Sequence, residues 1–420
     1  MKNKGLFLAA LLLLNIMAGC TITDVEWVKF QELEDFSDLD PQTSFVPFRK
    51  EANVFCEDMA TSFSLPFEPA TKTTSTNGAN LLRALLSSYR GKSIRSYCGT
   101  YYSRDHHGDP ILLSGRIMLP ADGKVSRIML VSHFTIGADR EAPSEELPLE
   151  SIYAAHGVAV VESDYIGYGV SADKIHPYLC AKVTARNVID MYFAALPFLK
   201  KIGCEPEFDD IFLLGFSQGG AVTMSTAQEL CSCYPDVDVR LVMCGGGPYD
   251  ICATYDTIIK NDNTDYPCAI PMIIQGLNYG MDLNLDYSQF FQPRMVENLD
   301  EWLNSKKYTM AEITQMIGSH KVSSIMTEEA MNKTAESMTD LYRAMLDNSA
   351  FYGLPPDYPI YLYHSIDDNV VPYVNATNME YQLYDANVIY NFGHYGTHQI
   401  STLRFFLCCV DLLKKYGDIY

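Results

Sequence analysis

From residue 96 onward, strand-like and helix-like patterns of hydrophobic and polar residues alternate along the chain. Short apolar or alternating runs typical of β-strands occupy residues 96–103, 111–119, 127–133, 158–162, 211–214, 240–244, 359–363 and 388–392. Helix-like runs lie between some of them, at residues 184–196 and 221–230. Because such alternation is typical of a doubly wound sheet, the pattern predicts an α/β fold with a mostly parallel sheet flanked by helices. The first two strands, joined by the polar turn at 105–109, are predicted to form an antiparallel hairpin.

The rhythm breaks at Gly245-Gly246-Gly247-Pro248, and about a hundred residues separate it from the next strand. Thr309 followed by Glu312 is a capping-box pattern that opens one helix of this insertion. Apolar residues predict one face of another helix at Met331, Ala335, Met338, Tyr342 and Met345. The sequence thus predicts a helical insertion over residues 250–350, which divides an α/β core into residues 93–249 and 351–420.

The N-terminal residues carry an export signal. Lys2 and Lys4 precede an apolar block at residues 6–14, and Met17-Ala18-Gly19-Cys20 follows, so residues 1–19 are predicted to be a signal peptide. The block is too short to be a membrane-spanning helix. Its end resembles a bacterial lipobox, which implies a lipid on Cys20; an ordinary cleaved signal is the alternative. Residues 20–92 show no strong period and are expected to be a tether and wrap, with a helix over 80–89.

Composition narrows the choice of partners. Nearly half of the residues are hydrophobic, so the chain can bury a large core, and its formal charge is −21. Loss of Lys2 and Lys4 with the signal peptide would change this charge to −23, which argues against nucleic acid and against electrostatic binding to anionic lipids. A lipid anchor would then be the only membrane contact, and a neutral small molecule is the expected substrate.

The cysteines show no zinc-binding spacing. Cys408 and Cys409 lie in an apolar run and are adjacent, so buried free thiols are expected there rather than a disulfide framework.

A serine stands between two glycines directly after an apolar strand, in Gly215-Phe216-Ser217-Gln218-Gly219. A nucleophile elbow places a serine on a sharp strand-to-helix turn, where the neighbouring positions must lack a Cβ. The helical run that follows begins with small residues, which lets a helix lie close to the sheet. Ser217 is therefore the expected nucleophile.

A serine nucleophile needs a neutral imidazole to accept its proton and an acid to orient that imidazole. The strand at 359–363 ends in His364-Ser365-Ile366-Asp367-Asp368-Asn369-Val370-Val371-Pro372, which resembles the H-G-x-x-D-x-x-V-P turn of α/β hydrolases. Asp368 has both spacings of that turn and Asp367 has neither. The loop after the last strand holds two histidines: His398, which precedes a helical run and is favoured as the base, and His394, which follows a glycine and stays the alternative.

An oxyanion hole needs two fixed N–H donors. One is expected to be the backbone N–H of Gln218, the residue after the nucleophile. The other is expected in the loop Ser132-His133-Phe134-Thr135-Ile136-Gly137, which resembles the H-G-T-x-G loop of the same superfamily; Phe134 and Thr135 are both candidates.

A longer resemblance covers roughly residues 95–410. Asp164-Tyr165-Ile166-Gly167-Tyr168-Gly169-Val170-Ser171, followed by His176-Pro177-Tyr178-Leu179, is similar to the D-Y-x-G-x-G-x-S and H-P-Y-L motifs of secretory-lipase-like α/β hydrolases, here a branch of exported bacterial lipoprotein esterases. The resemblance implies an α/β-hydrolase fold and carboxylester hydrolysis under a helical cap. His176 is expected to have a structural role.

The sequence predicts a serine carboxylester hydrolase with an acyl-enzyme intermediate and no cofactor. Two alternatives stay open: a serine peptidase, for which Glu328-Glu329 is the obvious acidic pair to hold an amine, and a surface lipoprotein that binds without catalysis. No metal is expected at His394 and His398, because Gly396 lies between them and an H-E-x-x-H glutamate is missing.

Overall fold

The computed structural model describes residues 36–55, 80–81, 84–85 and 92–417. Nine strands form one mixed sheet in the order β1-β2-β3-β5-β4-β6-β7-β8-β9. Their bounds are β1 Val46–Phe55, β2 Ser93–Arg104, β3 Pro110–Pro120, β4 Arg127–Ser132, β5 Val158–Ser163, β6 Ile211–Phe216, β7 Val239–Gly245, β8 Ile360–Ser365 and β9 Val388–Gly393. Every strand predicted from the sequence is present within a few residues of its expected bounds.

The sheet is antiparallel at one edge and parallel elsewhere. β1, β2, β3 and β5 pair antiparallel in that order, whereas β5, β4, β6, β7, β8 and β9 pair parallel. The β2–β3 hairpin is paired from Ile94↔Pro120 to Arg104↔Pro110, as its polar turn predicts. The expected mostly parallel sheet is therefore confirmed.

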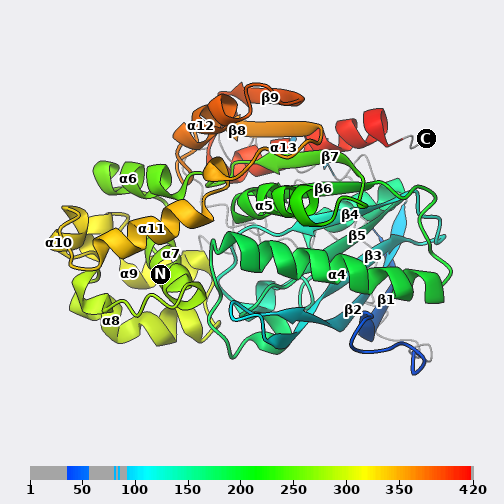
Figure 1. Ribbon diagram of the computed structural model, residues 1–420, viewed down its shortest axis with the longest axis horizontal. Helices are drawn as coiled ribbons and strands as arrows, with labels where there is room; N and C mark the ends of the chain where they lie inside the picture. Colours follow the sequence, from blue (N-terminus) through cyan, green and yellow to red (C-terminus); the bar gives the residue numbers. More distant parts are fainter. Residues whose placement is uncertain (1–35, 56–79, 82–83, 86–91, 418–420) are drawn as a thin grey trace, which may run out of the picture.

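Helices cover both faces of the sheet (Figure 1). α4 (Ala181–Lys201) and α5 (Gln218–Cys233) cover one face, where Phe198 and Met224 are fully buried. The 3₁₀-helix η2 (Leu149–His156) and α13 (His398–Tyr416) cover the other face, where Phe405 and Phe406 are fully buried. Because helices cover both faces of the parallel strands, the sequences of these strands are continuous apolar runs.

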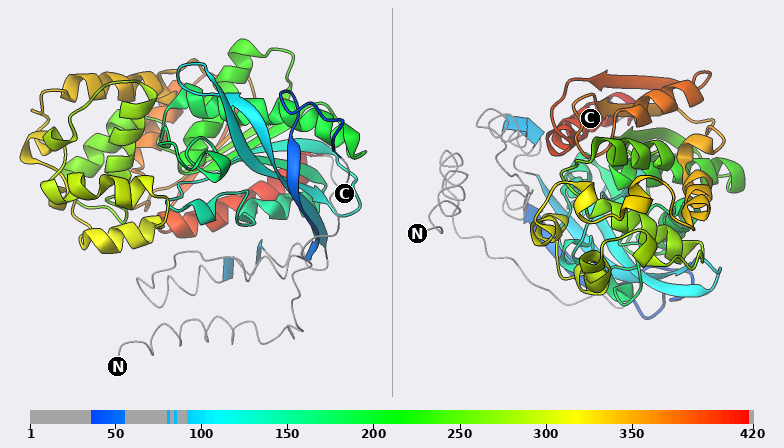
Figure 2. Two further views of the ribbon diagram at one scale, coloured as in Figure 1. Left: turned by 90° about the horizontal axis from the view of Figure 1, so that it is seen from below. Right: turned by 90° about the vertical axis from the view of Figure 1, so that its left-hand side faces the viewer.

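The chain between β7 and β8 is helical and gathers at one end of the sheet (Figures 1 and 2). We call residues 251–348 the cap. Its helices are α6 Ile251–Asn261, α7 Ala269–Gly280, η4 Tyr287–Gln289, α8 Pro293–Leu299, the π-helix η5 Asp300–Asn304, α9 Met310–Ile317, η6 Val322–Ser324, α10 Glu328–Met331 and α11 Met338–Asn348. The remaining helices are η1 Asp139–Glu141, η3 Gly169–Ser171, η7 Ala350–Tyr352 and α12 Val374–Gln382. The predicted capping box is present, since Thr309 Oγ1 accepts from Glu312 N and Glu312 Oε2 accepts from Thr309 N.

The single helix predicted through Met331 and Met345 is wrong, because the chain breaks it into α10 and α11. Lys333 has φ +60°, a left-handed conformation that ends a right-handed helix. Its ammonium group lies 2.7 Å from Asp256 Oδ1 of α6, so a contact with another helix accompanies the turn. Periodicity alone could not reveal this tertiary contact.

Strand β1 is a second difference, because the pattern of residues 20–92 predicted no strand. It adds to the antiparallel edge of the sheet beside β2. Residues 80–81 and 84–85 of the predicted helix at 80–89 are helical. The predicted signal peptide and Cys20 lie outside the described residues.

The ten cysteines in the described ranges are all free thiols. Cys409 is buried and Cys408 half-buried. None of the helices in the described part of the chain combines the length and apolar character needed to cross a bilayer.

Candidate active site

Ser217 lies on the turn between β6 and α5 with φ +60° and ψ −127°, a combination that L-residues rarely adopt. Its backbone N–H donates to Gly245 O over 2.9 Å, which ties the turn to the next strand of the sheet. The side chain forms no capping hydrogen bond to α5. The strained turn therefore holds the hydroxyl at the end of β6, free of the helix that follows it.

The two glycines that flank the serine are required by close packing. A Cβ at Gly215 would overlap the carbonyl oxygen of Gly219, and a Cβ at Gly219 would overlap the carbonyl oxygen of Ser132. The second contact brings the end of β4, and with it the loop after Ser132, against the start of α5. Local sequence thus determines both the turn and its nearest neighbour.

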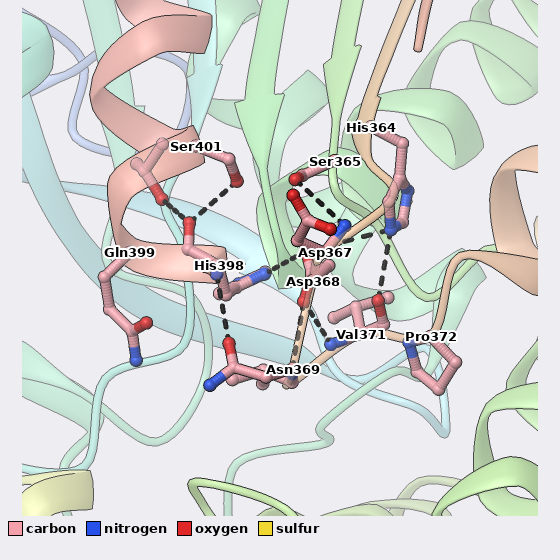
Figure 3. A network of polar contacts seen from close by, with 12 residues as sticks. His364, Ser365, Asp367, Asp368, Asn369, Val371, Pro372, His398, Gln399 and Ser401 are labelled. Atoms are coloured by element: carbon pink, nitrogen blue, oxygen red, sulfur yellow. Dashed lines mark hydrogen bonds and ion pairs between the residues drawn. The ribbon is translucent and has the colours of Figure 1, made fainter. Parts of the chain in front are cut away.

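His398 and Asp368 form a short contact at the ends of two other elements (Figure 3). The distance from His398 Nδ1 to Asp368 Oδ2 is 2.6 Å. The Asp368 side chain is fully buried, and the other carboxylate oxygen accepts hydrogen bonds from Val370 N at 2.9 Å and Val371 N at 2.8 Å. Because a carboxylate can only accept, His398 Nδ1 carries the proton and Nε2 is left unprotonated in the neutral ring.

Electrostatics favour an ionised Asp368. Burial alone would raise the pKa of this carboxyl group, but the charge and hydrogen bond of His398, together with His364 and the backbone N–H of Val370, lower the pKa below its usual value. Burial lowers the pKa of His364, and its Nε2 donates to Val371 O over 3.1 Å. This second histidine therefore fixes the loop that carries Asp368.

The loop around His398 is held by two polar side chains whose roles the sequence did not reveal. Asn369 Oδ1 accepts from His398 N over 3.1 Å at the start of α13. Ser365 Oγ donates to Gly396 O at 2.7 Å and accepts from Tyr395 N at 3.2 Å. The only sign of this role in the sequence was that Ser365 stands where the H-G-x-x-D pattern has glycine.

The alternative histidine lies elsewhere. His394 Nδ1 is 2.8 Å from Asp367 Oδ1, and the two side chains are 73% and 45% exposed. Neither residue lines the cavity that contains Ser217. The structure therefore brings His398, and not His394, into contact with Asp368 and into the cavity that Ser217 lines.

The loop after β4, where the second oxyanion donor is expected, is held by hydrogen bonds of its side chains. His133 is buried, which lowers the pKa of its imidazole to about 4, so the ring is neutral and donates from Nδ1 to Phe134 O over 2.7 Å. Thr135 Oγ1 lies 2.7 Å from the hydroxyl of Tyr178. These contacts hold the peptide that joins Phe134 to Thr135.

Gln218 is buried at the first position of α5, where its backbone N–H has no intrahelical acceptor. Its side-chain amide donates to His176 Nε2 over 2.7 Å, and His176 Nδ1 donates to Ile166 O over 2.8 Å. His176 thus has a structural role here, as expected: it holds the side chain of Gln218, the residue next to Ser217.

Ser217 and His398 line one cavity of about 490 Å³ between the core and the cap. The loop after β4 contributes Phe134 and Thr135, and the cap contributes Ile258 and Met310, among others. The Phe216 ring, beside the serine, lies 4.9 Å from the His398 ring. A cavity of this size and mostly apolar lining can hold a small organic molecule.

Two buried acidic residues, which the sequence did not predict, form part of the cavity wall. Glu150 and Glu162 both line the cavity, and neither carboxylate oxygen of Glu162 has a hydrogen-bond partner in the described structure. Burial raises the pKa of Glu150 to about 7 and raises that of Glu162 well above its usual value. Glu328 and Glu329, by contrast, do not line the cavity.

Solved structures share this architecture at low sequence identity. A Legionella pneumophila protein assigned as a hydrolase has a TM-score of 0.74 at 20% identity, over 89% of this chain and 98% of that chain. The rice cell wall degrading esterase LipA from Xanthomonas oryzae has a TM-score of 0.72 at 18% identity, over 90% and 99%. Candida antarctica lipase A has a TM-score of 0.56 at 17% identity, over 75% and 74%. The α/β-hydrolase fold with a helical cap is thereby confirmed.

No curated protein matches the chain. The sequence model of the family described as secretory lipase matches residues 145–399, which is more than half of the chain and includes the elbow, the cap and the loop that carries His398. The chain therefore belongs to the secretory lipase family and is a hydrolase that acts on ester bonds.

Proposed function

We propose that the protein is a serine carboxylester hydrolase in which Ser217 is the nucleophile, His398 the general base and Asp368 the residue that orients the base. One observation carries the proposal. An imidazole bound at Nδ1 to a buried carboxylate lines the same cavity as a serine on a strained strand-to-helix turn.

The proposed reaction has two half-reactions. Ser217 Oγ attacks the ester carbonyl carbon while His398 Nε2 accepts the serine proton, and Asp368 stabilises the resulting imidazolium ion. The tetrahedral intermediate then expels the alcohol, which takes the proton from His398, and an acyl-enzyme remains. Water, activated by the same imidazole, releases the carboxylic acid and restores the serine.

Negative charge on the tetrahedral intermediate needs preorganised donors. The proposed donors are Gln218 N–H and a backbone N–H at Phe134 or Thr135. The close approach of Gly219 to Ser132 supports this proposal, because the start of α5 and the loop after β4 are adjacent there. The hydrogen bonds of His133 and His176 keep both segments in place before substrate binds.

Ser217→Ala tests the proposal. Hydrolysis of p-nitrophenyl butyrate should fall to background, and a fluorophosphonate probe should no longer label the protein, while its circular dichroism and melting temperature stay those of the parent. Ser225→Ala, in a buried serine of α5 that does not line the cavity, is the matched control and should retain labelling. Undiminished hydrolysis by folded Ser217→Ala would exclude Ser217 as the nucleophile.

A peptidase is the second candidate, and the buried pair Glu150 and Glu162 favours it. The Glu162 carboxyl group in the cavity wall has no hydrogen-bond partner, and the ammonium group of an aminoacyl substrate would supply one and favour the ionised acid. Glu328-Glu329 cannot fill this role from outside the cavity. Leucine p-nitroanilide compared with p-nitrophenyl butyrate separates the two activities. Amide turnover that disappears in Glu162→Gln, with ester turnover retained, would favour the peptidase.

Membership in a secretory family indicates an exported protein. We propose in addition that Cys20 carries a lipid that anchors the protein to a bacterial membrane, because the residues before it form a short signal peptide that ends in a lipobox-like sequence. Metabolic labelling with an alkynyl fatty acid should mark the protein, and Cys20→Ala should abolish the label.

A further inference from the structure

Three side chains that can bind a metal meet where the core touches the cap. His106 and His107 lie in the turn of the β2–β3 hairpin, and Asp282 follows helix α7 in the cap. Two nitrogens and one carboxylate oxygen lie within 4.8 Å of one another. Within the described ranges, no other group of three or more His, Cys, Asp or Glu residues meets this condition.

The two histidine–aspartate distances are closer to the spacing between ligands of a tetrahedral zinc ion than to the length of a hydrogen bond. His106 Nε2 is 3.6 Å from Asp282 Oδ1, and His107 Nδ1 is 3.5 Å from Asp282 Oδ2. Direct N–H···O hydrogen bonds are shorter, at about 2.7–3.2 Å. Bonds of about 2.0–2.1 Å to a tetrahedral zinc ion place two ligand atoms about 3.3–3.4 Å apart. Each histidine faces a different oxygen of Asp282, and all the ligand atoms lie within 4.8 Å of one another, so side-chain adjustment without a change of fold would complete such a site.

The backbone presents the ligands before any ion binds. Asp105 Oδ1 accepts from His107 N and Asp109 N, both at 2.9 Å, so the hairpin turn is closed by its own side chain. On the cap side, Asp282 has φ +50° and its carbonyl oxygen accepts from Asn284 Nδ2 over 3.0 Å. Each segment is therefore held in its own conformation by hydrogen bonds that do not use the ligand atoms.

His106 supplies an independent observation. Its side chain is only 6% exposed, and neither ring nitrogen has a hydrogen bond in the described structure; Nδ1 is buried without a partner. Its ring packs between His107, at 4.0 Å, and Tyr279, at 4.5 Å. A buried imidazole without hydrogen bonds is costly. A cation bound at Nε2, the nitrogen that faces Asp282, would give the ring one strong partner, although Nδ1 would stay unpaired.

We propose that His106, His107 and Asp282 bind a divalent zinc ion that links the hairpin to the cap. Two imidazoles and one carboxylate form a borderline ligand set that suits Zn²⁺ rather than Mg²⁺ or Ca²⁺, which prefer oxygen ligands. None of the three residues lines the cavity of Ser217. The ion is accordingly a structural link, and ester hydrolysis does not pass through it.

Isothermal titration of the tag-free full chain, stripped by chelator, tests the proposal. Cys231 and Cys233 at the end of α5 are free thiols that are not fully buried, and thiolates are zinc ligands, so Cys231→Ser/Cys233→Ser is used as the parent to remove incidental binding there. We expect one zinc ion per chain, and binding weakened at least about 100-fold in His107→Ala and in Asp282→Asn. Saturating Zn²⁺ should raise the melting temperature of the parent by a few degrees, whereas Mg²⁺ should not.

The controls separate this site from incidental binding. His320→Gln removes an exposed imidazole outside the cluster and should bind zinc like the parent. Co²⁺ in place of zinc should give visible ligand-field bands without a thiolate charge-transfer band. Ester hydrolysis should be unchanged in both ligand variants, which also shows that they fold. Absence of saturable binding in the parent, equal binding in His107→Ala and Asp282→Asn, or a thiolate band would overturn the proposal.

Discussion

Two histidine–aspartate pairs lie side by side in this protein and share almost the same contact distance. His398 Nδ1 is 2.6 Å from Asp368 Oδ2, and His394 Nδ1 is 2.8 Å from Asp367 Oδ1. In each pair the aspartate comes from the loop after β8 and the histidine from the loop after β9 or the start of α13. Residue type and contact distance therefore do not distinguish them.

The surroundings of the two pairs distinguish them. Asp368 is fully buried and also accepts two backbone N–H groups, whereas Asp367 and His394 are largely open to solvent. His398 lines the cavity of Ser217 and His394 does not. Water screens the exposed pair of His394 and Asp367, the outer pair, so its attraction is weak. The packed loop holds the buried pair of His398 and Asp368, the inner pair, in one geometry. The comparison shows that chemistry here depends on burial and position, not on the pair itself.

The largest expected difference between the pairs is in catalysis by the histidines. His398→Ala should lower kcat for p-nitrophenyl butyrate on the order of 10⁶-fold, because the proposed nucleophile loses its base. His394→Ala should leave kcat essentially unchanged. A severe loss in His394→Ala with a mild one in His398→Ala would reverse the assignment of the base.

The aspartates should show the next largest difference. Asp368→Asn should lower kcat about 10⁴-fold, since an amide in place of the carboxylate favours the wrong tautomer of His398. Asp367→Asn is the isosteric control four residues before Val371 in the same loop and should retain the parent rate. Equal effects of the two substitutions would show that burial does not separate the pairs.

Stability should separate the aspartates in a pH-dependent way. The pKa of Asp368 is lowered in the folded protein, so its stabilisation is present above the unfolded pKa and is lost as pH falls through the folded pKa. Asp368→Ala leaves buried N–H donors without an acceptor and should cost at least about 1–3 kcal/mol of unfolding free energy at pH 7.

Urea unfolding at pH 7 and at pH 3 gives the measurement. The gap between the parent and Asp368→Ala should narrow at the lower pH, whereas Asp367→Ala should differ little from the parent at either pH. A gap that widens in acid would contradict the lowered pKa.

The smallest effect is the coupling within the outer pair. A double-mutant cycle with His394→Ala and Asp367→Ala should give about 1 kcal/mol or less, because both side chains are exposed. The coupling should decrease further in 1 M salt, where charges are screened within about 3 Å. A coupling of several kcal/mol that resists salt would mean that this pair, too, is part of a fixed site.

Much of the fold could be predicted because it depends on local patterns. Apolar runs of the right length gave the positions of β2 to β9, and the small residues after Ser217 announced α5 against the sheet. The elbow was also readable, since overlap of a Cβ with Gly219 or Ser132 requires glycine at positions 215 and 219. These requirements lie within a few residues of one another.

Features that depend on distant contacts were missed. The end of α10 involves a cap contact between Lys333 and Asp256, and β1 is a strand only because β2 offers it an edge. The cluster of His106, His107 and Asp282 joins residues more than 170 positions apart, so no spacing pattern could have revealed it.

Local steric needs and the order of apolar runs, both present in the sequence, were enough to predict the α/β architecture and the turn at Ser217. Motif spacing selected Asp368 and left two histidines that could serve as the base. Tertiary structure alone decided that His398 shares a cavity with Ser217 while His394 lies in solvent. The reason is physical: distances between loops far apart in the chain, and the water excluded between them, are set by how the sheet, α13 and the cap pack together.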